Sequence, residues 1–146
     1  MGRFSNLRAA AVVAEATRSY TFHDVAGAPT LVVAAAAQSN RDYFNAALAA
    51  ARERANAGRK VTVSSVADDR ATRAKLYAQH VVKGWRGVKD AAGAEVAFSV
   101  EACEEFLAEL ATPELAHLFN EFVAFIEEER NFTADAVALG KSSSSA

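Results

Sequence analysis

The segment WRGVKDAAGAEVAFSVEACEEFLAEL, residues 85–110, decides the fold, because a turn, extended residues and a capped helix follow one another within it. The turn lies at Ala91-Ala92-Gly93, and the residues on either side of it, within 85–98, indicate a short hairpin or two extended arms. Ser99 is expected to cap the next helix, since its hydroxyl can accept a hydrogen bond from a free backbone N–H. Trp85, the only tryptophan, is expected to be buried. The segment predicts a folding unit rather than a chemical site.

A β-hairpin is predicted upstream of this segment, over residues 20–35. Residues 20–25, YTFHDV, alternate aromatic and polar side chains, which is typical of a half-buried strand. Residues 26–29 contain a glycine and a proline and indicate a turn, and residues 30–33 supply a second strand. Residues 1–18 are weakly patterned, and we interpret them as a short helix that Asn6 caps, without a clear register.

The first long helix is predicted to begin after Ser39 or Asn40, either of which can cap it. It is expected to end at Gly58, because glycine adopts the left-handed conformation that closes many helices. Residues 61–63 are then expected to form a short strand or an extended linker.

A second helix is predicted to begin after Ser65 or Asp68 and to end at Gly84. Its apolar positions recur at helical spacing. They are Ala71, Ala74, Tyr77, Ala78, Val81 and Val82.

The last long helix has an explicit start signal in Thr112-Pro113-Glu114, which supplies a cap, a proline at the first position and an acidic first turn. It is expected to end near Glu129 or Arg130, with Phe132 packing back against it. Its apolar side chains are Leu115, Leu118, Phe119, Phe122, Phe125 and Ile126. We expect residues 1–132 to form one domain and residues 133–146 to form a frayed tail that ends in four serines.

The fold predicted from these elements is α+β and mainly α-helical: an N-terminal β-hairpin, four to five helices, and a short hairpin or turn around residues 85–98. The 146 residues suit a single domain, and much of the 51% apolar content is alanine, which favours helix. A single cysteine excludes a disulfide framework and favours a reducing, intracellular compartment. The apolar run at residues 9–14 is too short to span a membrane.

Charge is unevenly distributed along the chain. Residues 1–89 contain 14 Lys/Arg and 6 Asp/Glu, a net +8, whereas residues 90–146 contain 2 Lys/Arg and 12 Asp/Glu, a net −10. Solvated helix faces explain this better than a nucleic-acid surface. A basic cluster that could contact phosphates nevertheless exists, but the aromatic residues are not interleaved with it. Its members are Arg70, Arg73, Lys75, Lys83, Arg86 and Lys89.

Chemical sites find little support in the sequence, so no enzymatic activity, cofactor or metal is expected. His23, His80 and His117 lie in three different elements without metal-ligand spacing. Cys103 lies on an apolar helix face without an activating base and is interpreted as a core residue. Residues 84–87, GWRG, lack the phosphate-binding loop signature, and residues 127–129, EEE, are interpreted as a solvated helix end.

An interaction protein fits the sequence best. The phenylalanines of the last helix span more than a narrow stripe, and core packing is the leading explanation for them. Any of them left partly exposed would offer a partner helix an apolar patch. The candidate partner-binding residues are Phe122, Phe125, Ile126 and Phe132.

The order of several short motifs resembles the tail assembly chaperones of long-tailed, siphovirus-type bacteriophages. These motifs are residues 28–31 (APTL), Asn40 with residues 43–45 (YFN), Tyr77 with residues 81–88 (VVKGWRGV), then Asp90, Gly93 and Val96, and Phe98-Ser99 opening the acidic helix through Leu110. The resemblance covers about residues 20–132. It departs from the family's pattern at Ala97, where many relatives have proline, and residues 1–18 match nothing in the family.

The resemblance implies a non-enzymatic role in virion assembly. Such chaperones bind the long, helical tape measure protein, keep it soluble and help to recruit tail tube protein. They work in the cytoplasm of the infected host cell and are absent from the mature virion. Homo-oligomerisation is left open, and neither a membrane nor nucleic acid is expected as a partner. The alternative functions are a small structural or adaptor protein of the virion and, with less support, a nucleic-acid-binding regulator.

Tail assembly chaperones are often made in two lengths through a −1 ribosomal frameshift near the end of the shorter reading frame. A slippery heptamer of the form G GGA AAG encodes a codon ending in G, then glycine, then lysine. Leu139-Gly140-Lys141 fits that order a few residues before residue 146. A chance Gly-Lys pair in a polar tail explains the same residues equally well.

Overall fold

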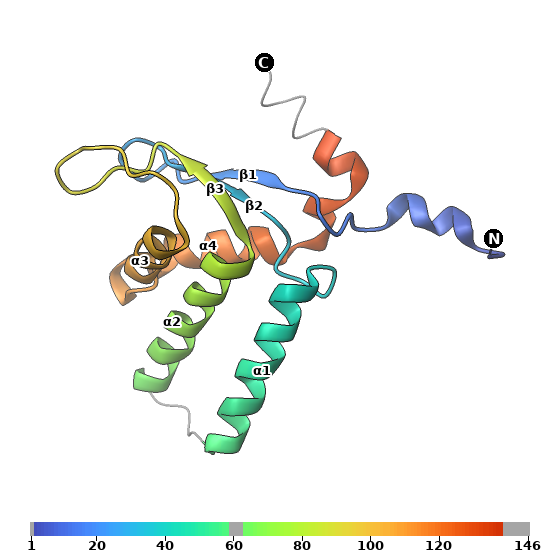
Figure 1. The fold of residues 1–146 in the computed structure, drawn as a ribbon, viewed down its shortest axis with the longest axis horizontal. Coiled ribbons are helices and arrows are strands. Elements are labelled where there is room, and N and C mark those ends of the chain that lie inside the picture. The colour runs from blue at the N-terminus through green and yellow to red at the C-terminus, as the bar shows by residue number, and fades with distance from the viewer. Residues whose placement is uncertain (1, 59–62, 139–146) are drawn as a thin grey trace.

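The structure, a computed structural model, describes residues 2–58 and 63–138. A three-stranded antiparallel sheet lies above the helices α1 to α4 in the view of Figure 1. The predicted fold class is confirmed: the chain is α+β and mainly helical, and the N-terminal hairpin supplies two strands of the sheet. The frameshift residues 139–141, most of the serine tail and residues 61–62 lie outside the described residues.

The sheet contains β1 (Arg18–Thr21), β2 (Thr30–Val33) and β3 (Val82–Arg86) in the order β1-β2-β3. The pairing of β1 with β2 confirms the predicted hairpin, but its first strand is Arg18–Thr21 rather than residues 20–25, and residues 22–29 connect the two strands. Leu31 and Val33 in the central strand are fully buried, because they face the helices. The β1–β2 turn touches the turn after β3 at Gly27 and Gly87. Both have positive φ, and a Cβ on either would lie 3.1 Å from the other's carbonyl oxygen, so both must be glycine.

The helices are α1 (Arg41–Ala57), α2 (Val63–His80), α3 (Val100–Leu110) and α4 (Ala116–Glu127). The described residues also form the 3₁₀ helices η1 (Ser5–Ala10) before β1, η2 (Pro113–Leu115) between α3 and α4, and η3 (Glu129–Phe132) after α4. The predicted caps are confirmed at both ends of α1 and at the start of α3. Asn40 and Ser99 accept from backbone N–H groups, and Gly58 adopts the left-handed conformation.

The structure corrects the predicted end of α2. The helix ends at His80, and Val82, which was assigned to its apolar face, begins β3 and pairs with Val33. The reason is tertiary: β2 has a second edge, and the extended residues that follow α2 satisfy its backbone groups. Trp85 is therefore part of the main sheet, opposite Leu31. It is half-buried rather than buried, and its indole N–H donates to the carbonyl oxygen of Val96 at 2.8 Å.

The turn predicted at residues 91–93 is present, although the hairpin around it is short. Only Lys89 and Glu95 form a β-bridge, and the carboxylate of Asp90 accepts from the backbone N–H groups of Ala92 and Ala94. Pro113 opens η2, so the predicted last helix begins as a 3₁₀ turn, and α4 ends two residues before Glu129.

The N-terminal residues also differ from the prediction. The helix expected from Asn6 through Arg18 is only the 3₁₀ helix η1, and β1 begins at Arg18. Residues 134–138 form a further helical turn. Near its start, the backbone N–H of Ala136 donates to the hydroxyl of Thr133. The domain boundary at residue 132 stays a prediction.

Candidate functional site

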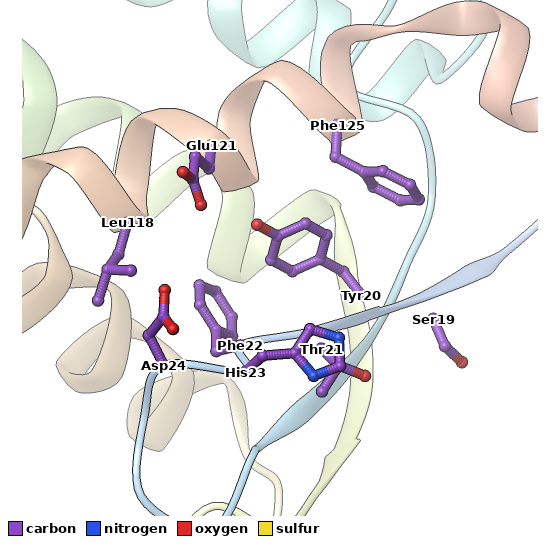
Figure 2. A pocket seen from close by; sticks show the side chains of 9 residues that line it. All are labelled: Ser19, Tyr20, Thr21, Phe22, His23, Asp24, Leu118, Glu121 and Phe125. Carbon is purple, nitrogen blue, oxygen red and sulfur yellow. The ribbon is translucent and has the colours of Figure 1, made fainter.

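A groove of about 370 Å³ runs between the edge strand β1 and helix α4 (Figure 2). Side chains from the strand side and the helix side face each other across it, with aromatic rings at its centre. It is the best candidate for a partner-binding site. Its lining residues are Ser19, Tyr20, Thr21, Phe22, His23, Asp24, Leu118, Glu121 and Phe125.

The alternation of the YTFHD stretch builds the strand side of the groove. In a strand successive side chains point to opposite faces, so Tyr20 and Phe22 both turn toward α4. The Tyr20 ring lies 5.2 Å from the ring of Phe125 and 5.4 Å from that of Phe122, centroid to centroid. Phe22 packs edge-on against Phe106 of α3 at 5.7 Å. These contacts fix the strand on the helices and leave Tyr20 and Phe125 as the aromatic lining of the groove.

The rim of the groove is acidic. Asp24 and Glu121 are both exposed, and Figure 2 shows their carboxylates turned toward the space between strand and helix. Burial raises the pKa of Tyr20, and the negative charges of Glu121 and then Asp24 raise it further. The phenol therefore stays neutral, and the groove combines apolar rings with two negative charges.

Arg18 lies against the Phe125 ring of the groove. Its guanidinium carbon lies 5.4 Å from the centroid of the Phe125 ring, and its Nη1 donates to the carbonyl oxygen of Asn131 at 3.0 Å. Such a cation–π contact holds the aromatic ring in place. Phe125 is therefore positioned before any partner arrives.

The free edge of β1 lies alongside the groove. The backbone N–H of Phe22 donates to the carbonyl oxygen of Pro29, so the residues of β1 that bond to β2 alternate with residues whose backbone groups point outward. By this alternation Ser19 and Thr21 present their N–H and C=O groups to solvent. An edge of this kind can accept a further extended segment.

Only one of the four predicted partner-binding residues reaches this site. Phe122, Ile126 and Phe132 are fully buried, and Phe125 alone is half-buried and lines the groove. The three others belong to the core: Phe122 packs against Phe22 and against Tyr77 of α2, and Phe132 packs against Phe125. The structure places these three in the core of the isolated chain, which does not offer them to a partner as exposed contacts, and partner binding by any of the four residues stays a prediction.

Sequence reasoning missed the strand side of the groove. Tyr20 and Asp24 were assigned to a hairpin and given no role, and Glu121 was not singled out. The alternating aromatics carried a signal that one strand face is covered, but nothing in their spacing says that α4 covers it.

A polar cluster ties α2 to α4 beneath the sheet. Arg73 Nη2 lies 2.7 Å from Glu127 Oε1, and the Tyr77 hydroxyl donates to the same oxygen at 3.2 Å. Arg70 donates to the carbonyl oxygen of Ala111 at 2.9 Å. Two members of the basic cluster predicted for phosphate contacts are thus bonded within the protein, and Glu127 is an ion-pair partner.

Cys103 is fully buried, in agreement with the prediction that it is a core residue. Burial raises the pKa of its thiol to about 12, with a smaller contribution from Glu104. The thiol is protonated at neutral pH and is a poor nucleophile. Within residues 2–58 and 63–138, no three His, Cys, Asp or Glu side chains gather into a metal-binding group, and no helix is long and apolar enough to cross a membrane.

The burial of Cys103 gives a direct prediction. In the folded protein its thiol should react with a disulfide reagent at pH 8 at least about a hundredfold more slowly than in denaturant, because only opened molecules expose it. Absorbance of the released thiolate measures both rates. Equal rates would contradict the placement of Cys103 in the core.

Comparison with known protein families matches residues 37–139 to the family described as YdaY prophage protein. The chain belongs to this family. It is thus a phage-derived protein, and the match runs from the residues just before α1 to the helical turn after η3. Leu118, Glu121 and Phe125, on the helix side of the groove, lie within the matched residues, whereas β1 lies before them. Searches of curated proteins and of solved structures returned no match.

Proposed function

We propose that this phage-derived protein is a tail assembly chaperone that binds the tape measure protein and assists assembly of the tail tube. Two things support the proposal: membership of a prophage protein family, and the ordered motifs that resemble tail assembly chaperones. The observation that carries it is the β1–α4 groove, in which the half-buried ring of Phe125 lies between other apolar rings and an acidic rim. The role is a binding role, exercised in the cytoplasm of the infected cell and ending before the virion matures.

The groove suits a segment that carries an apolar side chain flanked by basic ones. Phe125 and Tyr20 offer the apolar contact, since aromatic rings contribute strongly where a partner excludes water. Asp24 and Glu121 attract positive charge and disfavour acidic segments. A long helix with regularly spaced apolar residues would be kept soluble while such a groove covers part of its apolar stripe.

Co-expression with the tape measure protein of the same prophage tests the proposal. Replacing Phe125 by Asp should reduce co-purification by about tenfold or more, because a carboxylate would sit where the partner's apolar side chain packs. Leu48→Asp is the matched control, since Leu48 is an exposed apolar residue on α1, far along the chain from the groove. That variant should co-purify as the wild type does.

A second variant keeps the test decisive if Phe125→Asp weakens the fold. Glu121 is exposed, and its side chain has no hydrogen bond among the described residues, so Glu121→Arg should leave the far-UV spectrum and melting temperature unchanged. It should nevertheless weaken co-purification, because it reverses a rim charge. Undiminished co-purification of both folded variants would place tape measure binding outside this groove.

A further inference from the structure

An N-terminal arm, residues 2–10, carries apolar side chains that nothing in the fold covers. Phe4 is 66% exposed and Leu7 is 67% exposed, and η1 has no buried residue. The other large exposed apolar side chains of the described residues are spread over separate elements, except Val13 just after the arm. Exposed apolar residues gathered on one short segment indicate a contact that the isolated chain does not make.

The arm has an apolar stripe between positive charges. A 3₁₀ helix has three residues per turn, so Phe4, Leu7 and Ala10 succeed one another on one side. Arg3 and Arg8 fall on the two flanks of that stripe, and the arm contains no acidic residue, which gives it a net charge of +2. The guanidinium of Arg3 lies 5.5 Å from the centroid of the Phe4 ring, which keeps charge and ring together.

The root of the arm, Val12 and Val13, is held by hydrogen bonds beside one end of the groove. Val12 forms a β-bridge with Thr133, and the N–H of Val13 donates to the carbonyl oxygen of Phe132 at 3.0 Å. Phe132 in turn packs against Phe125 of the groove, with 6.2 Å between ring centroids. From this root the arm points away from the body of its own chain (Figure 1). It therefore leaves the molecule next to a groove that it does not enter.

We propose that the arm of one copy docks in the β1–α4 groove of a second copy, and that reciprocal exchange of arms produces a homodimer. The chemistry of the two surfaces is complementary. Phe4 and Leu7 meet the apolar lining, while Arg3 and Arg8 meet the acidic rim. The inference does not depend on the proposed function, because the partner is the same chain.

A closed dimer follows from the position of the root. When an arm emerges beside the groove that receives its counterpart, one two-fold axis can satisfy both contacts at once. Exchange of an arm between identical copies is a low-cost route to such a dimer. Each copy then covers the apolar stripe of the other, which removes the exposed patch.

Light scattering after gel filtration measures the mass of the purified protein in the absence of any phage partner. The wild type should have twice the chain mass of 15.5 kDa, and deletion of residues 2–10 should give a monomer. The double variant Arg3→Glu/Arg8→Glu should also be monomeric, with an unchanged far-UV spectrum, because both arginines are exposed. A monomeric wild type at all concentrations, or a dimer that survives the deletion, would overturn the inference.

Mixing charge-reversed variants identifies the two surfaces as partners. Asp24→Arg/Glu121→Arg reverses the rim and should alone be monomeric, like Arg3→Glu/Arg8→Glu. In a mixture, each acidic arm meets a basic groove and each basic arm meets an acidic groove, so a heterodimer should form. Absence of that heterodimer would show that the arm does not contact this rim.

The arm variants also separate this inference from the proposed function. Arg3→Glu/Arg8→Glu leaves the groove intact and removes the competing arm from it, so co-purification of the tape measure protein should persist or increase while the dimer is lost. If changes in the arm leave the dimer unaffected and tape measure binding is normal, the arm exchange is contradicted and the proposed function is not. If tape measure binding is lost in the groove variants but not in the arm variants, the result supports the proposed function.

Discussion

Replacing Phe122 by alanine is expected to lower the free energy of unfolding by about 3–5 kcal/mol. The ring is fully buried and contacts Tyr20 of β1, Phe22 just after that strand, and Tyr77 of α2. Truncation leaves a cavity at the point where sheet and helices meet, and the surrounding rings cannot collapse into it without losing their own packing. Since a domain of this size is stable by about 5–15 kcal/mol, the variant should be close to unfolding.

Urea denaturation followed by circular dichroism measures this change. Val100→Ala is the control, because Val100 is an apolar helix residue that is 40% exposed, and its truncation should change stability by less than about 0.5 kcal/mol. Phe122→Leu keeps most of the volume and should fall between the two. A loss below about 1 kcal/mol for Phe122→Ala would return this residue to the surface, as a partner-binding side chain.

The local signals in the sequence predicted local structure well. Asn40, Gly58 and Ser99 mark helix ends because capping depends on a few neighbouring backbone groups, which the sequence contains within one turn. The hairpin of β1 and β2 was predictable for the same reason, since its two strands are neighbours in the chain and a segment with glycine and proline separates them. Such features need no knowledge of the distant chain.

The third strand shows where local reasoning ends. Val81 and Val82 continue the helical spacing of α2, yet Val82 pairs with Val33, nearly fifty residues earlier. Whether these residues extend a helix or complete a sheet is decided by the free edge of β2, which is a tertiary feature. The sequence between Ser65 and Gly84 contains no signal that the edge of β2 is free to pair.

The candidate site was predicted only in part for a similar reason. The apolar positions of α4 identify a helix buried on several sides, but they do not say which side chain lies at the margin. Phe122 and Phe125 differ by less than one turn, and one is fully buried while the other lines the groove. Only the position of β1 distinguishes them, and β1 is brought there by contacts from about a hundred residues away in the chain.

Replacing Asn40 by alanine is expected to lower the free energy of unfolding by about 2–4 kcal/mol, more than the loss of an ordinary helix cap. Its side-chain oxygen accepts from the N–H of Tyr43 at 3.3 Å. Its amide nitrogen donates to the carbonyl oxygen of Ala35 at 3.0 Å and to that of His80 at 2.9 Å. One side chain thus joins the start of α1, the end of α2 and the segment after β2.

Two substitutions separate the cap from the amide donors. Ser99→Ala removes a cap alone, from α3, and should cost about 1 kcal/mol. Asn40→Asp keeps a good cap acceptor but replaces the donating amide by a carboxylate that faces two carbonyl oxygens, so it should cost at least as much as Asn40→Ala. If Asn40→Asp is instead as stable as the wild type in urea, the bonds to Ala35 and His80 contribute nothing. Residue 40 would then act only at the start of α1, and the junction between the two helices would be held by apolar packing such as the stacked rings of Tyr43 and Tyr77.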